Sequence, residues 1–348
     1  MTRQILAISA LFGAAVLGAP AAAYAQAFTV EKFNIGGEGG HDYIVAEAGS
    51  SRVFVSRGTH VMVVDGATGK VIGDIPDTPR VHGIGLAARE NHGFTTNAGD
   101  SSVTMFDLKT LAFIKKIPIK VGGLDGIMYD ATSNRIILTN HSNPGTAVTL
   151  DAKTGDILGT AELEDRAPEG AATDGKGRIF VNNEGTNTIQ VIDLKTMKVL
   201  ASWPIAPCES PTGIALDRKT MRIFSGCSKT SVVVDATNGK VVANITNGDG
   251  VDALGWDGSQ KLIYIPAGQS GNVTVVRQDG PDSYTPVATV PTMRGAKTIA
   301  VDAGTHRAYA VALERGPAPA PAPGAPAGGR PPQGPVIGAW LFVISQGK

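Results

Sequence analysis

The stretch Ile189-Gln190-Val191-Ile192-Asp193 decides the fold, because the same apolar strand ending in aspartate recurs along the chain. The successive aspartates differ by 42, 44, 42 and 42 positions and are Asp65, Asp107, Asp151, Asp193 and Asp235. A sixth copy at residues 273–276 has Arg277 in the aspartate's place, and a seventh covers residues 341–345. A period of about 40 to 45 residues is typical of β-propeller blades.

Each unit contains a second strand with a large residue in register, about eight residues before the recurring strand. These residues are Phe54, Phe94, Ile137, Phe180, Phe224, Tyr264 and Tyr309. The third unit shows the complete pattern of four short strands, at residues 124–130, 135–139, 147–151 and 156–161. Four antiparallel strands make one propeller blade.

The two ends of the chain complement each other. The seventh unit lacks a fourth strand, and residues 28–35 form an orphan strand before the first complete unit. We therefore predict an all-β, seven-bladed propeller in one domain, residues 26–348, whose N-terminal strand completes the C-terminal blade. Such closure removes exposed sheet edges.

A turn rich in Thr, Asn, Gly and Lys follows the recurring aspartate, as in Ala236-Thr237-Asn238-Gly239-Lys240. Aspartate caps backbone groups in such turns, and glycine accepts a positive φ. We therefore interpret these aspartates as structural and not catalytic.

The repeats resemble the periplasmic YVTN family of YncE-like proteins, whose units contain a V-x-V-I-D strand followed by a K-V-V-x-x-I strand. The best copies are residues 189–193 with 198–200, and residues 232–235 with 240–242. The resemblance covers almost all of the chain after residue 25. It implies a WD40-like propeller but no particular chemistry, since propellers carry many activities.

The N-terminus has the layout of a secretory signal peptide. Arg3 precedes an apolar run at residues 5–17, and small residues end in Ala23-Tyr24-Ala25. Thirteen apolar residues fall short of the roughly 20 of a spanning helix. We expect cleavage after Ala25 and a soluble, secreted periplasmic protein.

The charge balance argues against two classes of partner. The chain has 31 basic and 31 acidic residues, and loss of Arg3 with the signal peptide leaves a charge of −1. No strong field therefore attracts nucleic acid or an anionic membrane. We expect a small ligand or a periplasmic protein as partner, and a monomer as the default state.

A polar residue stands at the start of the innermost strand in every unit. The ring consists of Asp42, His82, Asp125, Glu169, Thr212, Asp252 and Lys297. The loops that enter the innermost strands and leave the second strands must share one face of the disc, which we call the top face.

Two interpretations of this ring are open. Polar residues at strand starts cap backbone groups and line a wet channel in any propeller. Alternatively, a bound cation relieves the repulsion between converging carboxylates. The candidate metal ligands, which suit calcium, magnesium, manganese or zinc, are Asp42, His82, Asp125, Glu169 and Asp252.

The ends of the second strands bring further polar residues to the top face. Arg57, Asn97, Asn140 and Asn183 are candidates for binding a polar ligand, and His60, His141 and Glu184 lie close to them in the sequence. Asparagine at these ends is also common in YVTN repeats and is a good turn residue.

The two cysteines, Cys208 and Cys227, flank the first two strands of the fifth unit. In an oxidising compartment we expect a disulfide between them. The absence of a C-x-x-C motif from the sequence argues against a thioredoxin-like or c-type haem function.

Residues 316–335 are almost entirely Pro, Ala and Gly. They form an insertion between the second and third strands of the seventh unit, which places it on the top face. It is interpreted either as a semi-rigid lid or docking segment, or as a surface loop without a role.

Two functions compete. The first is a non-catalytic binding or scaffold protein that holds a small ligand, an ion or a protein at the channel mouth. The second is a metal-assisted hydrolase or lactonase, in which a cation polarises an ester carbonyl and His82 or Glu169 acts as general base. The sequence contains no G-x-S-x-G, H-E-x-x-H or phosphate-loop motif.

Overall fold

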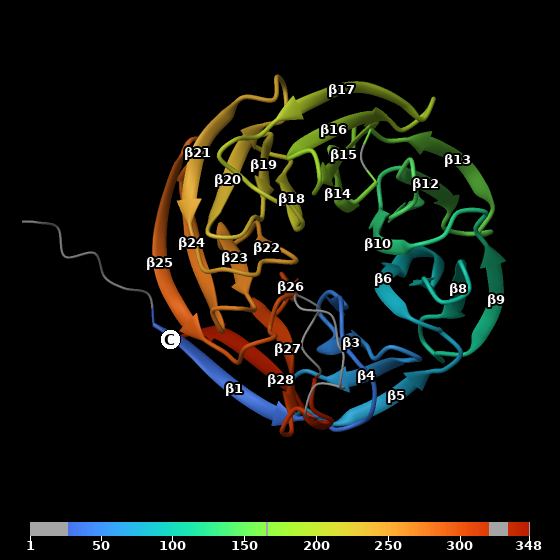
Figure 1. Ribbon diagram of the computed structural model, residues 1–348, viewed down its shortest axis with the longest axis vertical. Helices are drawn as coiled ribbons and strands as arrows, with labels where there is room; N and C mark the ends of the chain where they lie inside the picture. The colour runs from blue at the N-terminus through green and yellow to red at the C-terminus, as the bar shows by residue number, and fades with distance from the viewer. Residues whose placement is uncertain (1–26, 165, 320–332, 348) are drawn as a thin grey trace, which may run out of the picture.

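Seven four-stranded antiparallel sheets surround a central channel in the computed structural model, which describes residues 27–164, 166–319 and 333–347 (Figure 1). The predicted seven-bladed propeller is thereby confirmed. In the described part of the chain the helical structure is one short 3-10 turn, η1 (Ala88–Glu90), and no helix there has the length and apolarity to cross a membrane. The expected signal peptide, residues 1–25, lies outside the described residues.

The blades follow the chain order, with the innermost strand first. Blades one and two consist of β2 (Ile44–Ala46), β3 (Arg52–Ser56), β4 (Val61–Asp65), β5 (Val71–Ile75), β6 (Val81–Ala87), β7 (His92–Asn97), β8 (Ser102–Asp107) and β9 (Phe113–Pro118). Blades three and four consist of β10 (Leu124–Asp130), β11 (Arg135–Asn140), β12 (Thr146–Asp151), β13 (Ile157–Glu162), β14 (Pro168–Thr173), β15 (Arg178–Asn183), β16 (Thr188–Asp193) and β17 (Lys198–Pro204).

The remaining three blades complete the ring. They consist of β18 (Ile214–Asp217), β19 (Arg222–Ser225), β20 (Thr230–Asp235), β21 (Val241–Thr246), β22 (Gly255–Asp257), β23 (Leu262–Ala267), β24 (Asn272–Gly280), β25 (Ser283–Pro291), β26 (Ile299–Asp302), β27 (Arg307–Arg315), β28 (Val336–Gln346) and β1 (Phe28–Asn34).

The seventh blade contains both ends of the described chain. Strand β1 pairs antiparallel with β28 over seven positions, from Phe28 opposite Gln346 to Asn34 opposite Trp340. In Figure 1 the blue β1 runs along the outer edge beside the red β28. The predicted closure by the N-terminal strand is confirmed.

The core lies between neighbouring blades. All seven large residues predicted in the second strands are buried, and their exposed fractions are 1% or less. Strands β3, β7 and β11 have four or five consecutive buried residues, as expected for strands that are covered on both faces.

The recurring aspartates are structural, as their turns predicted. Asp65 Oδ1 accepts the backbone N–H groups of Ala67 (2.7 Å) and Thr68 (3.2 Å), and Asp151 Oδ1 accepts those of Lys153 (2.7 Å) and Thr154 (2.9 Å). Each carboxylate therefore holds the tight turn between the third and fourth strands of its blade.

Glycine lets neighbouring innermost strands approach closely at the channel. A Cβ on Gly126 would lie 2.8 Å from Thr139 Oγ1 and 3.0 Å from the Glu169 carbonyl oxygen. Gly83, Gly170 and Gly213 occupy the same position in their blades and line, with Gly126, a channel cavity of about 200 Å³. The residues that precede these glycines are consequently pressed together at the channel mouth.

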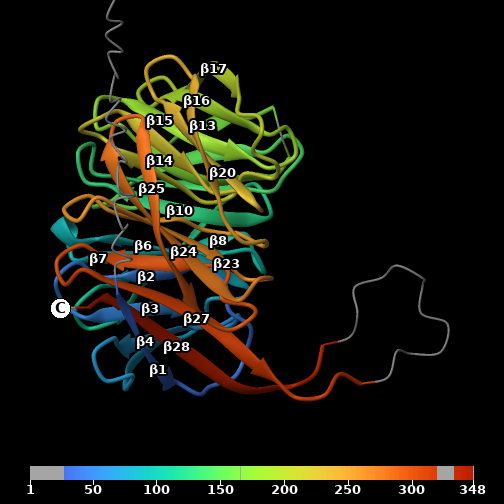
Figure 2. The ribbon, with the colours of Figure 1, turned by 90° about the vertical axis from the view of Figure 1, so that its left-hand side faces the viewer.

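The described flanks of the Pro-rich insertion place it between β27 and β28, as predicted. Arg315 pairs with Val336, and Gly316 N–H donates to Pro335 O (2.8 Å). The hairpin projects beyond the neighbouring blades (Figure 2). Residues 320–332 lie outside the described residues, and a lid or docking role stays a prediction.

Candidate metal centre

Side chains and carbonyls of adjacent blades fix the positions of the ring residues. Thr96 Oγ1, on the second blade, donates to Asp125 O (2.5 Å), and Thr139 Oγ1, on the third, donates to Glu169 O (2.8 Å). Thr298 Oγ1 closes the ring by donating to Asp42 O (2.6 Å). Because each contact holds the backbone of the next blade, the ring residues lie on rigid elements.

Five side chains of the predicted ring form one continuous network. Lys297 Nζ donates to Asp42 Oδ1 (2.9 Å) and to a carboxylate oxygen of Asp252. The other Asp42 oxygen, Oδ2, lies 2.5 Å from His82 Nδ1, which is also 3.5 Å from Asp125 Oδ1. The network therefore alternates between acidic and basic groups.

His141 connects the network to Glu169, the sixth of the predicted ring residues that belong to it. Its Nε2 atom lies 3.2 Å from Asp125 Oδ2 and 3.1 Å from Glu169 Oε1. Tyr43 Oη reaches across the channel mouth from the first blade and donates to Glu169 Oε2 (3.3 Å). Asp125 thus has one imidazole on each side.

The network contains two groups with the composition of a metal site. Asp42, His82 and Asp125 form one group, and Asp125, His141 and Glu169 form the other. Within each group, one potential ligand atom per residue lies within 4.8 Å of the others. Both groups share the carboxylate of Asp125.

The carboxylates raise the pKa values of both imidazoles. The hydrogen bond with Glu169 raises the pKa of His141 to about 9, against the effect of burial. The hydrogen bond with Asp42 raises the pKa of His82 in the same way. A field that stabilises an imidazolium proton also attracts a metal cation, and a bound metal would displace these protons.

Asp125 is a buried carboxyl group with a raised pKa at the middle of the centre. Burial raises its pKa to about 7, with further contributions from the charges of Glu169 and Asp42. The residue is 9% exposed. Among the described residues, its Oδ1 atom has no hydrogen-bond partner, although His82 Nδ1 lies 3.5 Å away. A buried oxygen without a hydrogen bond is costly unless another group satisfies it.

The other predicted binding residues do not join this network. Thr212 Oγ1 donates to Val251 O (3.0 Å). Arg57 is fully buried, and its guanidinium donates to the carbonyl oxygens of residues 36–39, which positions the segment between β1 and β2.

The three predicted asparagines are buried at the ends of their strands. Asn97 Nδ2 donates to Thr104 Oγ1 (2.8 Å), and Asn140 and Asn183 bond in the same way to the third strands of their own blades. Their contacts tie the second strand to the third, as expected for a repeat residue with a structural role.

Sequence reasoning omitted three residues of the channel mouth. It placed His141 on the top face but not among the candidate ligands. Tyr43 occupies the position at which the next four blades have glycine. This break in the repeat could have identified Tyr43 as a candidate functional residue. His41 Nε2 lies 3.0 Å from Gly295 O, and burial, followed by the charge of Lys297, lowers its pKa to about 4.

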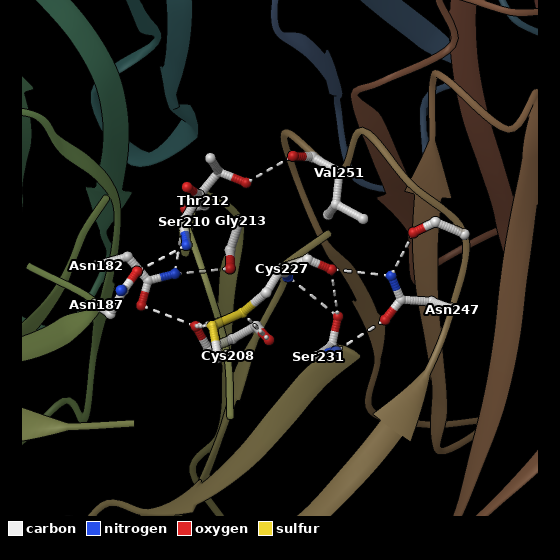
Figure 3. Close-up of a disulfide and its surroundings, with 12 residues drawn as sticks. Asn182, Asn187, Cys208, Ser210, Thr212, Gly213, Cys227, Ser231, Asn247 and Val251 are labelled. Atoms are coloured by element: carbon white, nitrogen blue, oxygen red, sulfur yellow. Dashed lines mark hydrogen bonds between the residues drawn. A yellow bond between two sulfur atoms is a disulfide. The ribbon is translucent and has the colours of Figure 1, made fainter. Parts of the chain in front are cut away.

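The predicted disulfide joins Cys208 and Cys227, whose Cα atoms are 5.6 Å apart (Figure 3). Both residues are buried. Asn182 beside the disulfide donates to Gly213 O (2.9 Å), and Asn247 donates to Cys227 O (2.9 Å). The disulfide and these amides stabilise the loops around Thr212.

The donor set favours particular metals. Two imidazoles accompany three carboxylates, and imidazole suits zinc, iron, nickel and copper, whereas calcium and magnesium prefer oxygen ligands alone. Manganese accepts both ligand types. The side chains of His82 and His141 are 27% and 35% exposed, so an ion can reach both groups from the top face.

Comparisons with known proteins agree on the fold. No protein-family model matches the chain, and no curated protein matches it. Hydrazine synthase of Kuenenia stuttgartiensis is 17% identical over 78% of this chain and 92% of that chain, with a TM-score of 0.68. The WD40 repeats of RRP9 are 10% identical over 90% and 97%, with a TM-score of 0.74, and U3-55K is 9% identical over 91% and 98%, with a TM-score of 0.73. At these identities the likeness shows a WD40-like propeller fold alone.

Proposed function

We propose that this chain is an exported YVTN-type propeller that binds a divalent transition-metal cation at its channel mouth and does not catalyse a reaction. The repeats support the YVTN assignment, and the N-terminal segment supports export to the periplasm. The observation that carries the proposal is the pair of groups around Asp125, each with one imidazole and two carboxylates within 4.8 Å.

The net charge of the side-chain network favours a bound cation over a channel mouth that contains only water. The network holds the carboxylates of Asp42, Asp125, Glu169 and Asp252 and the single ammonium of Lys297. When a metal displaces the protons of both imidazoles, four negative charges and one positive charge leave a net charge of −3, whereas protonated imidazoles leave −1. Partly buried like charges repel one another strongly, and a divalent cation relieves that repulsion.

The arrangement favours binding over hydrolysis. His82 and Glu169 are the bases that a metal-assisted hydrolase would use, and both contribute ligand atoms to the two groups. An atom that coordinates a metal cannot also accept a proton from a substrate or a water molecule. The site therefore supports the non-catalytic function better.

Elemental analysis of the mature protein, purified without a chelator, tests the proposal. We expect a stoichiometric transition metal, which EDTA removes, and a rise in the melting temperature when zinc or manganese is added back. An ion present at 100 times its dissociation constant stabilises a folded protein by about 2.7 kcal/mol. The double substitution His82→Ala and His141→Ala should abolish the effect.

His306→Ala is the matched control, because His306 also pairs with a buried aspartate, Asp257, at 2.9 Å, but does so on the opposite face. It should retain the metal. If the wild-type protein contains no metal and no divalent ion shifts its melting temperature, the proposal is wrong.

A further inference from the structure

We infer that the channel mouth binds two divalent cations at once, bridged by the carboxylate of Asp125. This inference rests on the proposed function and specifies the composition of the same centre. It starts from the two groups of potential ligands, which have one member in common.

The two carboxylate oxygens of Asp125 face different imidazoles. Oδ1 faces His82 Nδ1 at 3.5 Å, and Oδ2 faces His141 Nε2 at 3.2 Å. A carboxylate with one oxygen toward each of two ligand groups has the geometry of a bridging ligand. Because Oδ1 has no hydrogen-bond partner among the described residues, it is available to an ion.

The two halves of the centre are built alike. On one side Asp42 uses Oδ1 for Lys297 Nζ (2.9 Å) and turns Oδ2 toward His82. On the other side Glu169 uses Oε2 for Tyr43 Oη (3.3 Å) and turns Oε1 toward His141. Each terminal carboxylate thus has one oxygen fixed by an outer donor, a device that orients metal ligands.

Each half offers one imidazole, one terminal carboxylate and one oxygen of the bridge. Three protein ligands are the usual number for an ion that keeps an open coordination position. Charge also permits a second ion. With both imidazoles neutral as ligands the network carries −3, so two divalent cations leave a net charge of only +1.

Manganese gives the most direct test, because two bridged Mn²⁺ ions couple magnetically and single ions do not. We would free the mature, disulfide-bonded protein of metal, titrate it with Mn²⁺ by calorimetry, and record its electron paramagnetic resonance spectrum. We expect two ions per chain and an exchange-coupled spectrum in place of the six-line spectrum of an isolated ion.

Three variants assign the ligands. Asp125→Asn should abolish the exchange-coupled signal. His82→Ala and His141→Ala should each lower the stoichiometry from two ions to one and leave a six-line spectrum. Asp257→Asn removes a buried carboxylate on the opposite face and should leave two coupled ions. The single histidine variants decide the question if Asp125→Asn does not fold.

The outcomes separate this inference from the proposed function. One uncoupled ion per chain would overturn the bridged pair and leave cation binding intact. No bound Mn²⁺, together with no effect of zinc on the melting temperature, would overturn both. Two coupled ions in Asp125→Asn would refute the role of Asp125 as the bridge.

Discussion

Tyr43 breaks the repeat at the channel mouth. The next four blades have glycine at this position, where the innermost strands approach closely, whereas the first blade carries a phenol that reaches Glu169 on the opposite side. Burial, with the charges of Asp125 and Glu169, raises the pKa of Tyr43 well above its usual value. The hydroxyl therefore keeps its proton and acts only as a donor to Glu169.

Tyr43→Phe should weaken Mn²⁺ binding about tenfold and leave the number of ions unchanged, because the substitution removes an outer donor and no ligand. Calorimetric titration measures both quantities. Tyr129→Phe is the control, since its hydroxyl donates to Asn134 Oδ1 (2.8 Å) at the other end of the third blade. Equal affinity in wild type and Tyr43→Phe would contradict the orienting role.

Gly126→Ala should lower the free energy of unfolding by about 1–3 kcal/mol, the usual cost of overpacking. The added Cβ would meet Thr139 Oγ1 and the Glu169 carbonyl, and the carbonyl belongs to the backbone of the next blade. Gly122→Ala, whose Cβ would have only Ser101 Oγ at 3.7 Å, should change stability by less than about 0.5 kcal/mol. Denaturant unfolding of both variants tests the difference.

The sequence predicted some individual residues well and others poorly, for a physical reason. The strand-start ring is periodic, so counting along the repeat located Asp42, His82 and Asp125. His141 belongs to no periodic set. It follows β11 in the same blade as Asp125, and its contact with Asp125 depends on the direction of its side chain in a loop that the repeat does not specify. The same counting predicted that Arg57 binds a ligand. Its guanidinium instead donates hydrogen bonds to the carbonyl oxygens of residues 36–39.

Connections between elements of different blades stabilise the face opposite the centre. Arg218, which follows β18, donates to Thr173 O on β14 (2.8 Å) and to Asp130 Oδ1 on β10 (2.8 Å). One side chain thereby joins three blades. Asp130 is 1% exposed, so its carboxylate is a buried partner of this cation.

This contact makes a defined contribution to the pH dependence of stability. Burial opposes ionisation of Asp130, but hydrogen bonds from Ser133, Thr173 and Arg218 outweigh it and lower its pKa. A carboxyl group with a lowered folded-state pKa stabilises the protein above its unfolded-state pKa, and the contribution is lost as the pH falls through the folded-state value.

Asp130→Asn should therefore lower the free energy of unfolding by about 1–3 kcal/mol at pH 7, and the difference from wild type should shrink below about pH 4. Denaturant unfolding at several pH values measures it. A difference that is constant from pH 7 to pH 3 would show that the charge of Asp130 does not contribute.

The disulfide stabilises the two loops that flank β18 and β19. Replacing both Cys208 and Cys227 by serine should lower the free energy of unfolding by roughly 3 kcal/mol, the chain-entropy value for a loop of this length. The comparison is made by denaturant unfolding of the two proteins. Reduction of the wild type should lower stability by a similar amount, whereas an unchanged midpoint would argue against this contribution.

The complete ring depends on its closure. Phe28 and Val30 on β1 pack against buried residues of the sixth and seventh blades, in a cluster that includes Tyr264 and Ile344. The fold and this closure were predictable, because seven periodic units with one missing strand and one orphan strand admit a single simple arrangement. A role for the Pro-rich insertion was not predictable, since Pro, Ala and Gly specify no binding partner.

Deletion of residues 28–34 should expose the edge of β28, lower the melting temperature and promote oligomers. Light scattering and thermal unfolding measure both effects. A synthetic peptide of residues 27–36 added in trans should restore the monomer by pairing with β28. A truncated protein that stays monomeric with an unchanged melting temperature would show that the strand is dispensable.

The shared seventh blade also sets the order in which the structure can form. A polypeptide emerges with its N-terminus first, so β1 is synthesised before all other strands, yet its partner lies about 316 positions later, as Thr29 and Ser345 show. Six blades can form from local hairpins, and the last step joins the two most distant parts of the chain. The oldest strand of each molecule is consequently the last to pair, and loss of the final ten residues would leave a ring that cannot close.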